Sequence, residues 1–358
     1  MQLQVREIAA PEAIRAEWEA IVERSVRATV FQTWDWIAGQ IAHGLYSGEP
    51  LILGFFDGEE LVGIAPLIRK GQGSAVRRLM LLGGDYNDLI SEACYEPSVL
   101  EAFAEWLESN TWELCDFRSL HRNSLLSRFG EADWPVLPFH YRRFEHQLYP
   151  VLNLPESRGE LESRIGKNLR QEIRYIPRKV AKDHQDFGWR LATPQTFNED
   201  IEALFRLHQL RWTSKGMPGV FAEEPVKAFH RSVARGFLAR GRLALYTASV
   251  GKREIASLYC LRQGSELVYY LGGFDPGFRQ YSPMKFLIGQ AIFDGLDSGA
   301  RVFDFLKGEE DYKSRWRAEP RPTHRLLISA RGLRSRFVMT ALELQPKIKA
   351  IRRRSRDG

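Results

Sequence analysis

Three apolar segments joined by very short turns constrain the fold of this chain more than any other feature. They occupy residues 243–250, 254–261 and 266–274. Glycine-containing turns of a few residues separate them and leave no room for a crossover helix. The three segments are therefore predicted to pair as an antiparallel meander.

Helices and further strands are predicted around this meander. Their ranges are 187–192 (strand), 196–215 and 225–239 (helices), 283–297 (helix), and 302–306 and 325–330 (strands). The first half of the chain shows a looser version of the same order, including a hairpin predicted at Asp57-Gly58 between two apolar runs. The sequence therefore predicts an α+β fold in two tandem domains, each with a mixed, mostly antiparallel sheet flanked by helices.

A polar, basic segment separates the two halves. Within it, Ile165, Leu169 and Ile173 recur at intervals of four residues, which predicts a helix with one apolar stripe and outward-facing arginines. Ser157 or Ser163 is suited to cap a helix here. The predicted divisions are an N-terminal domain at 1–155, a basic helical bridge at 156–186, a C-terminal domain at 187–330 and a basic tail at 331–358.

Charge and cysteine content limit the class of protein. The net charge is +6, and much of the excess lies in the tail. The tail is either a solvated, partly disordered segment or a contact for an anionic membrane, an acidic polymer or RNA, but its few aromatic residues argue against specific nucleic-acid binding. Three scattered cysteines fit a reducing cytosol. We expect a cytoplasmic protein without a signal peptide or membrane helix, at most peripheral to a membrane.

The junction between the meander and the helix at 283–297 is the most informative for function. The strand ends near Gly272-Gly273, and paired glycines at a strand end permit close approach of a ligand to the backbone. Ser282 is suited to be the N-cap of the helix. A helix N-terminus exposes unpaired N–H groups and a partial positive charge, which favour an anion such as a pyrophosphate. Arg279 and Lys285 would add positive charge; the plain alternative is a well-capped helix after a hairpin.

Two segments in this region resemble motifs of known acyltransferases. Residues 279–284, RQYSPM, are similar to the acyl-CoA turn of GNAT acyltransferases, with Ser282 and Met284 standing where small glycines are usual. Residues 302–316, VFDFLKGEEDYKSRW, resemble the D-F-x-x-G-x-x-x-Y-K-x-x-W signature of CelD/BcsL-type acetyltransferases. That family is associated with cellulose and exopolysaccharide synthesis and is distantly related to the Fem peptidoglycan aminoacyltransferases. Segments 31–36, 84–88, 167–174 and 207–212 agree with the resemblance.

The resemblance implies two GNAT-like domains, with the acyl-CoA site in the second. The implied donor is acetyl-CoA or another acyl-CoA, and no metal is implied. The residues implied to hold the donor are Leu271, Gly272, Gly273, Arg279, Gln280, Tyr281, Ser282, Met284 and Lys285. The backbone near 271–273 is expected to donate a hydrogen bond to the thioester oxygen as it becomes an oxyanion.

Four residues of the segment 302–316 are implied to carry the chemistry. Asp304 would orient or deprotonate the acceptor, with Glu309 as an alternative base, and Tyr312 would protonate the departing thiolate. Lys313 would bind phosphate or polarise the carbonyl. Each has a plain structural alternative: a carboxylate that bonds backbone N–H groups, an acid that complements a helix dipole, a tyrosine at the edge of the core and a surface lysine.

The acceptor is expected to be an amine or hydroxyl of a sugar, a polysaccharide precursor or a related small molecule. Asp85 and Tyr86, which follow a predicted strand of the first half, are candidates to contact it. Trp34 and Trp212 are candidates for a sugar-stacking platform. The competing interpretations are a turn held by Asp85 and core positions for both tryptophans.

Two other functions stay open from the sequence. One is a Fem-like transferase that uses aminoacyl-tRNA and a peptidoglycan precursor, although the sequence shows no heptad-like helical hairpin for tRNA. The other is a non-catalytic scaffold in polysaccharide assembly, which the departures at Ser282 and Met284 allow. Metalloprotease, NTPase and α/β-hydrolase motifs are absent from the sequence. His208 and His230 lie in apolar helical patterns and are expected to be core residues rather than bases.

Overall fold

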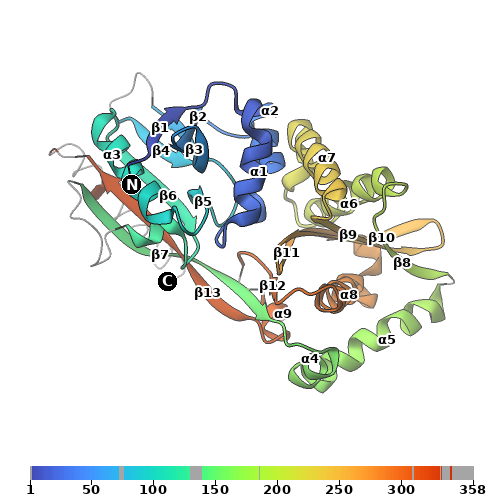
Figure 1. Ribbon diagram of the computed structural model, residues 1–358. Helices are drawn as coiled ribbons and strands as arrows, with labels where there is room; N and C mark the ends of the chain where they lie inside the picture. Colours follow the sequence, from blue (N-terminus) through green and yellow to red (C-terminus); the bar gives the residue numbers. More distant parts are fainter. Residues whose placement is uncertain are drawn as a thin grey trace, which may run out of the picture. The chain divides into compact units, whose positions relative to one another are not determined.

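The computed structural model describes residues 2–71, 76–129, 139–184, 186–308, 310–330, 332 and 339–340. The chain divides into two compact units. Unit 1 comprises Met1–Ile41, Tyr46–Gln147 and Pro322–Gly358, and unit 2 comprises Ala42–Leu45 and Leu148–Arg321. The chain passes between the units within two long strands, β7 (His140–Asn153) and β13 (Glu319–Ser329), so the main segment of unit 2 is an insertion into unit 1 (Figure 1).

Unit 1 consists of a sheet and short helices. Its other strands are β1 (Gln4–Glu7), β2 (Glu49–Asp57), β3 (Glu60–Lys70), β4 (Arg78–Leu81), β5 (Ile90–Ser91) and β6 (Leu114–Leu120). Its helices are α1 (Arg15–Arg24), α2 (Trp34–Ala42) and α3 (Glu96–Ser109), with 3-10 turns η1 (Pro11–Ile14), η2 (Val30–Gln32) and η3 (Leu125–Arg128).

Unit 2 consists of a sheet with longer helices. Its other strands are β8 (Phe187–Leu191), β9 (Leu243–Val250), β10 (Arg253–Gln263), β11 (Glu266–Phe274) and β12 (Val302–Asp304). Its helices are α4 (Arg158–Arg164), α5 (Lys167–Asp183), α6 (Phe197–Thr213), α7 (Glu224–Ala239), α8 (Pro283–Asp297) and α9 (Asp311–Ser314), with 3-10 turns η4 (Val220–Ala222) and η5 (Pro276–Tyr281).

The strands of the two units follow the same order. Unit 1 has the order β1-β2-β3-β4-β6-β13, and unit 2 has the order β8-β9-β10-β11-β12-β7. In each unit the fourth and fifth strands are parallel, and the neighbouring pairs are antiparallel. The fourth strand of each unit also leads into or ends in Leu-Gly-Gly, at 82–84 and 271–273. The prediction of an α+β fold with tandem, mixed and mostly antiparallel sheets is confirmed.

The short turns that predicted these sheets have the expected geometry. Gly58 closes the hairpin between β2 and β3 with a φ of 60°, in the left-handed region that glycine adopts readily. Gly251 and Gly264 have positive φ values of 55° and 53° in the turns of the meander formed by β9, β10 and β11. The antiparallel meander was therefore predictable from the turn chemistry.

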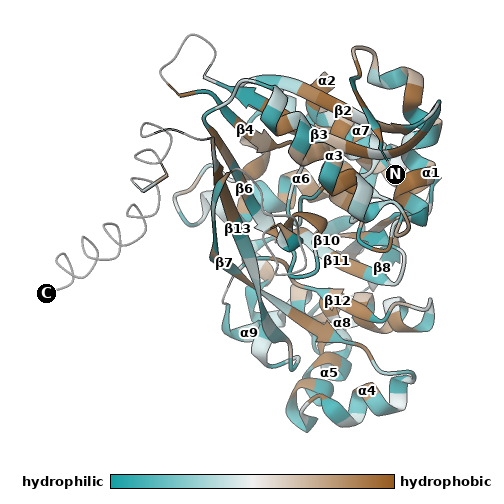
Figure 2. Cartoon of the chain, turned by 60° about the vertical axis from the view of Figure 1, so that its left-hand side comes forward, coloured by the Kyte–Doolittle hydropathy of each residue, from teal (hydrophilic) through white to brown (hydrophobic). Residues whose placement is uncertain are grey.

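Each unit has its own hydrophobic core. In unit 1, residues of β2, β3, β4 and β6 pack with one face of α3. In unit 2, residues of β9, β10 and β11 pack with α5 and α8, whereas α6 packs on the opposite face of the same strands. Figure 2 shows the resulting hydrophobic colouring of strands such as β2 and β3, whose central residues are buried.

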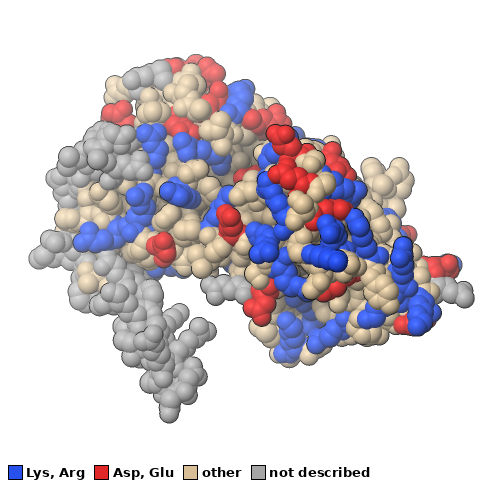
Figure 3. Space-filling model, turned by 90° about the horizontal axis from the view of Figure 1, so that it is seen from below, with Lys and Arg blue, Asp and Glu red and all other residues tan. Residues whose placement is uncertain are grey.

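The basic bridge is helical, but it forms two helices, α4 and α5, where the sequence predicted one. The Ser157 side chain caps α4 by accepting a hydrogen bond from the N–H of Glu160 at 3.2 Å. Leu169 and Ile173 lie on the buried face of α5, as the predicted apolar stripe requires, whereas the buried Ile165 is the extended residue that ends α4, so the stripe does not include it. Figure 3 views the molecule from the side of α4 and α5 and shows lysine and arginine side chains gathered over this part of the surface.

The end of the chain differs from the sequence-based division. Residues Pro322–Ser329 of β13 belong to unit 1, because Leu326 pairs with Phe117 and Ile328 with Cys115 of β6. The basic tail at 331–358 lies almost entirely outside the described residues, so the predictions about it stay untested. Among the described residues, no helix combines the length and apolar character that crossing a bilayer requires.

Candidate functional site

One edge of β11 is open where the predicted donor site lies. β11 pairs with β10 along its length, from Gln263↔Glu266 to Ala256↔Phe274. Its parallel pairing with β12 covers only Glu266–Val268. In the described part of the chain, the stretch from Tyr269 to Phe274 therefore has a strand partner on one side only. A bulge at Tyr270, opposite the Tyr259/Cys260 step, lies at the start of this stretch and increases the local twist.

Glycine is required at positions 272 and 273 for different structural reasons. A Cβ at Gly273 would lie 2.2 Å from the backbone N of His208 and 2.4 Å from the carbonyl carbon of Leu207, so the backbone of α6 rests directly on this residue. A Cβ at Gly272 would face the opposite side, 2.6 Å from Cε of Met284 and 3.0 Å from the hydroxyl of Tyr269. Only Gly272 thus faces the region where a ligand was predicted; Gly273 serves the packing of α6.

The N-terminus of α8 has no side-chain cap. Ser282 occupies the predicted N-cap position, but its φ of 53° and ψ of 48° are left-handed, and its side chain makes no capping hydrogen bond. The prediction of a serine cap was wrong because a capping side chain requires an extended backbone at that residue. No side chain closes this helix end, but Pro283 has no N–H, and the N–H groups of Lys285 and Phe286 donate to the carbonyl oxygen of Ser282 at 3.0 Å and 3.4 Å.

Charged groups surround the entrance to α8. Lys285 forms an ion pair with Glu172 of α5 at 2.5 Å, and Arg315 contacts the other oxygen of the same carboxylate at 2.7 Å. Hydrogen bonds from Arg315 and then from Lys285 lower the pKa of Glu172, so this carboxylate stays ionised. Two cations therefore share one anion, which leaves a net positive charge beside the helix N-terminus.

The 3-10 turn before α8 holds the remaining predicted donor ligands. Arg279 is exposed. The carbonyl oxygen of Gln280 accepts a hydrogen bond from Lys179 of α5 at 2.6 Å, and the buried Tyr281 donates its hydroxyl to Asp183 at 2.8 Å. Tyr281 therefore anchors the turn to α5, and of these three residues only Arg279 presents an exposed cation.

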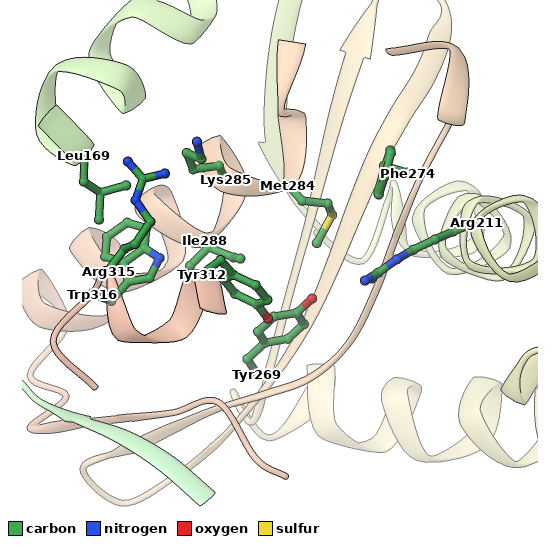
Figure 4. Close-up of a pocket in the computed structure, with 10 residues that line it drawn as sticks. All are labelled: Leu169, Arg211, Tyr269, Phe274, Met284, Lys285, Ile288, Tyr312, Arg315 and Trp316. Carbon is green, nitrogen blue, oxygen red and sulfur yellow. The ribbon is translucent and has the colours of Figure 1, made fainter. Parts of the chain in front are cut away.

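A cavity of about 200 Å³ lies between β11, α8 and α9. Its lining residues are Leu169, Arg211, Tyr269, Phe274, Met284, Lys285, Ile288, Tyr312, Arg315 and Trp316 (Figure 4). The wall is mostly apolar, with a few polar groups at defined positions, which is the usual composition of a small-molecule site. Met284, Lys285 and Tyr312 were predicted site residues, and the structure brings these three together.

Two tyrosines and an arginine form the polar part of this cavity. The hydroxyls of Tyr312 and Tyr269 face one another, and Arg211 lies close enough for its charge to offset part of the rise that burial causes in the pKa of Tyr269. Burial raises the pKa of both tyrosines, and the neighbouring Glu310 raises that of Tyr312 further. Arg211 also donates to the carbonyl oxygen of Gly272 at 3.3 Å. Figure 4 shows the two hydroxyls facing one another, with Arg211 reaching toward them from α6.

The other predicted catalytic residues do not line the cavity. The buried Asp304 accepts a hydrogen bond from the N–H of Leu306 at 2.7 Å, which supports a left-handed turn at Leu306. Lys313 is only 4% exposed and donates to the carbonyl oxygens of residues 305–308 at 3.1–3.4 Å, in addition to an ion pair with Glu310 at 2.8 Å. Both residues thus hold the segment after β12 in place. Glu309 lies outside the described residues.

The predicted acceptor-binding residues are largely buried. Trp34 is 6% exposed and packs edge-on against Trp18 at 5.7 Å, so its ring does not offer a surface for stacking. Trp212 stacks at an angle on His208 and lies under Lys215, away from the cavity lining. The buried Asp85 and Tyr86 lie in unit 1, where Tyr86 has a φ of 55°. Such a conformation is unfavourable for an aromatic residue, and a role for this turn in acceptor binding stays a prediction.

The predicted core histidines are confirmed. His208 and His230 are 1% and 2% exposed and pack around Phe221. Burial lowers the pKa of His208 to about 4 and that of His230 to about 3. Both are neutral at pH 7. No cluster of three or more potential metal ligands occurs among the described residues.

Seven of the lining residues were not predicted as site residues, among them the polar Arg211, Tyr269 and Arg315. Arg211 lies in the segment 207–212, which resembles a family motif, and this was the available signal. Tyr269 lies within the apolar pattern of β11 and offers no signal of its own. Tyr269 comes to face Tyr312 because α9 places Tyr312 in the same cavity.

Comparison with known proteins gives the class of the domain in unit 2. Residues 167–314 match the model of a protein family described as an acetyltransferase (GNAT) domain. The matched segment includes all residues of the cavity lining except Arg315 and Trp316, which follow it directly. Unit 2 is therefore similar to GNAT acetyltransferase domains over this segment. A search of curated proteins found no match to this chain.

Solved structures share the fold over both units. The crystal structure of FemX has a TM-score of 0.62 at 10% identity, covering 90% of this chain and 96% of that chain. The C-terminal domain of a putative lysylphosphatidylglycerol synthetase from Agrobacterium fabrum has a TM-score of 0.57 at 13% identity, with coverages of 94% and 98%. L-PGS from Bacillus licheniformis has a TM-score of 0.55 at 12% identity, with coverages of 92% and 95%. At these identities the similarity establishes the fold, and together with the family match it supports a transferase.

Proposed function

We propose that unit 2 transfers an acyl group from an acyl-CoA, with acetyl-CoA as the simplest donor, to an amine of a small acceptor. The open edge of β11 between Tyr269 and Phe274 carries this proposal. Among the described residues this stretch has a strand partner on one side only, and such an open strand edge suits the amides of a pantetheine arm; the adjoining cavity of about 200 Å³ suits a short acyl group. The uncapped N-terminus of α8, with Arg279 exposed beside it, suits the pyrophosphate.

The reaction requires an amine nitrogen to attack the thioester carbon. As the C–N bond forms, the carbonyl oxygen gains negative charge, and backbone N–H groups at the open edge of β11 stabilise it. The C–S bond then breaks, and the thiolate receives a hydrogen bond or a proton. The amine loses its proton to a base. The candidate is Glu310, which pairs with Lys313 at 2.8 Å and whose charge adds to the effect of burial in raising the pKa of Tyr312.

Tyr312 is the proposed donor to the departing sulfur. Burial raises its pKa, so it keeps its proton at neutral pH, whereas a free thiol has a pKa of about 8.5. Complete proton transfer from Tyr312 to the thiolate is therefore uphill, and its contribution is a hydrogen bond that strengthens as charge develops on sulfur. The hydroxyl of Tyr269 faces that of Tyr312, with Arg211 beside it, and these neighbours are proposed to orient the Tyr312 hydroxyl.

The acceptor class follows from the resemblance of residues 302–316 to CelD/BcsL-type acetyltransferases. We infer an amino sugar or another polysaccharide precursor in the cytoplasm, with attachment to a membrane surface through the tail as a secondary expectation. In support, the segment that carries the resemblance contributes Tyr312 and Trp316 to the cavity, and Lys313 holds its backbone.

Calorimetric titration with acetyl-CoA tests the donor. Gly272→Val should abolish binding, because the added side chain points at Met284 and the Tyr269 hydroxyl. Gly188→Val on β8 is the matched control, since a Cβ there meets nothing within 4 Å. Wild-type protein that does not bind acetyl-CoA, or equal binding by both variants, would rule out the proposed site.

A rate measurement tests the chemistry. Release of free thiol from acetyl-CoA would be followed with a panel of amino sugars. Tyr312→Phe should retain acetyl-CoA binding and slow turnover by about 10²-fold, the typical effect of losing one hydrogen-bond donor to charge that develops in the transition state. Tyr175→Phe, a change at a tyrosine of α5 that is 57% exposed, should have no effect. An unchanged rate in Tyr312→Phe would remove this residue from the mechanism.

The second candidate is a Fem-like transferase with an aminoacyl-tRNA donor. The exposed basic face of α5, which includes Lys167, Arg174 and Arg178, favours it, because such a face suits a phosphate backbone. Replacing these three residues by glutamine should abolish salt-sensitive tRNA binding and spare acetyl-CoA binding. Binding of tRNA without acetyl-CoA would favour this candidate, and binding of neither donor would favour a non-catalytic scaffold.

A further inference from the structure

Unit 1 contains a second cavity, of about 270 Å³, which is independent of the site in unit 2. It lies where β3 ends and β4 begins, next to the C-terminal end of α3. Four basic residues line it, Arg69, Lys70, Arg77 and Arg78. Trp106, Trp112, Asn110 and Thr111 form much of the remaining wall. Its volume is close to the lower limit of about 300 Å³ for small-molecule sites.

Two of the four cations are neutralised by acidic residues. Arg69 forms an ion pair with Glu7. Arg77 contacts both oxygens of Glu113, with its Nη2 at 2.7 Å from Oε1 and its Nε at 3.2 Å from Oε2. These pairs hold the two guanidinium groups in place at the rim and leave no surplus charge on them.

The other two cations face each other without an acidic partner. Lys70 of β3 is directly opposite Arg78 of β4 in the antiparallel register. No ion pair or hydrogen bond of either side chain occurs within the described ranges of the chain. Like charges at directly opposed positions of a sheet repel one another. Two elementary positive charges are therefore concentrated at one side of the cavity.

The C-terminal end of α3, next to the cavity, does not repel a negatively charged ligand. Carbonyl groups of a last helical turn normally carry partial negative charge. Here the carbonyl oxygens of Glu105, Trp106 and Leu107 accept hydrogen bonds from Ser109 Oγ at 3.0 Å, Asn110 Nδ2 at 2.8 Å and Trp112 Nε1 at 2.7 Å. Side chains thus cap the acceptors that would otherwise repel a negative ligand.

We propose that this cavity binds a phosphate monoester whose organic part lies against Trp106. A phosphate monoester carries a charge of about −1.5 to −2 at neutral pH, which matches the surplus of Lys70 and Arg78. Arginine and lysine are the side chains best suited to its oxygens. The half-buried Trp106, which stacks on Phe103 with the rings nearly parallel at 5°, supplies a rigid apolar wall. The ligand is either a soluble phosphate ester or a lipid with a phosphomonoester headgroup.

Calorimetry with phenyl phosphate and with inorganic phosphate tests the site. Wild-type protein should bind phenyl phosphate more tightly, because only this probe has a ring for Trp106. The double variant Lys70→Gln/Arg78→Gln should bind both probes at least tenfold more weakly. Arg6→Gln/Arg24→Gln is the matched control, because it removes the same charge from two exposed residues of unit 1 that lie outside the cavity. Trp106→Ala should weaken the binding of phenyl phosphate alone.

Two further measurements separate lost binding from unfolding, and a lipid ligand from a soluble phosphate ester. The thermal midpoint of Lys70→Gln/Arg78→Gln should equal or exceed that of the wild type, because the repulsion is relieved, so lost binding will not reflect unfolding. Flotation with phosphatidylcholine vesicles, with and without phosphatidic acid, separates the two sources. Retention only with phosphatidic acid indicates the lipid, and calorimetric binding without retention indicates the soluble ester. The proposal is overturned if the wild type binds neither phenyl phosphate nor these vesicles, or if the double variant binds like its control.

Discussion

Replacing each of two adjacent glycines by alanine makes a matched test of the packing around β11. At Gly273 the new Cβ would lie 2.2 Å and 2.5 Å from the backbone N and Cα of His208. A helix backbone cannot rotate away as a side chain can, so α6 would have to shift. At Gly272 the nearest atom, at 2.6 Å, is Cε of Met284, which is the end of a flexible side chain.

The magnitudes follow from these contacts. Overpacking a well-packed site costs about 1–3 kcal/mol, and Gly273→Ala belongs at the upper end, about 3 kcal/mol. Alanine recovers about 0.4–1 kcal/mol by restricting the unfolded chain, which leaves a net loss of about 2–2.5 kcal/mol. For a unit of this size that corresponds to a fall in melting temperature of about 4–10 °C. Gly272→Ala should cost about 1 kcal/mol before the same gain, and so change stability little.

Urea unfolding followed by tryptophan fluorescence and circular dichroism measures both variants. The expected result is a clearly lower midpoint for Gly273→Ala and a near-native midpoint for Gly272→Ala. Acetyl-CoA binding should show the opposite order, because only the alanine at 272 faces the cavity. A loss of stability that is equal in the two variants, or larger at 272, would refute the direct contact between α6 and β11.

Three further predictions concern stability. Burial holds the pKa of His208 at about 4 and that of His230 at about 3, both below the unfolded value of about 6.5, so each histidine should cost unit 2 up to about 3 kcal/mol as the pH falls from about 6.5 to 4. His208→Gln should therefore remove about half of this dependence in urea titrations at pH 7 and 5, and an unchanged slope would contradict the assignment. Asp116→Asn weakens the buried ion pair between Asp116 and Arg325, which are 2.6 Å apart, and should lower the stability of unit 1 by about 3 kcal/mol. Glu59→Gln, at an exposed ion pair, should change the stability by less than about 1 kcal/mol. Similar losses in the two variants would show that burial of the ion pair does not decide the effect. Lys313→Met removes the side chain that donates hydrogen bonds to the carbonyl groups of residues 305–308, so this segment should become more susceptible to limited proteolysis. The control is Lys252→Met, a change in an exposed turn. Equal cleavage rates in the two variants would show that Lys313 does not hold this segment in place.

The sequence predicted the scaffold well because the scaffold depends on local chemistry. The bounds of β11 and α8 agree with the predicted ranges 266–274 and 283–297. Glycine turns fixed the pairing of β9, β10 and β11, and the spacing of apolar residues fixed the buried face of α5. Each of these signals spans fewer than about twenty residues, within the range over which periodicity is informative.

The contacts of the site were not predictable because they join distant segments. Lys285 bonds Glu172 across 113 positions, and Tyr281 bonds Asp183 across 98. From the sequence alone, both appeared available to hold phosphate. Arg211 entered the cavity through the packing of α6 on Gly273, which no local pattern shows. The buried position of Lys313 was hidden for the same reason, since surface and buried lysines look alike in a sequence.

The insertion of unit 2 into unit 1 affects the order in which a growing polypeptide can fold. β12 pairs with β7, which has already been synthesised, so unit 2 can complete its sheet as soon as its own residues leave the ribosome. β6 receives its neighbour β13 only after residue 319, some two hundred residues later. A nascent chain arrested before that point would present an uncovered β6 edge to other chains, and unpaired strand edges promote aggregation. The unit that begins first during translation is therefore the one that finishes last.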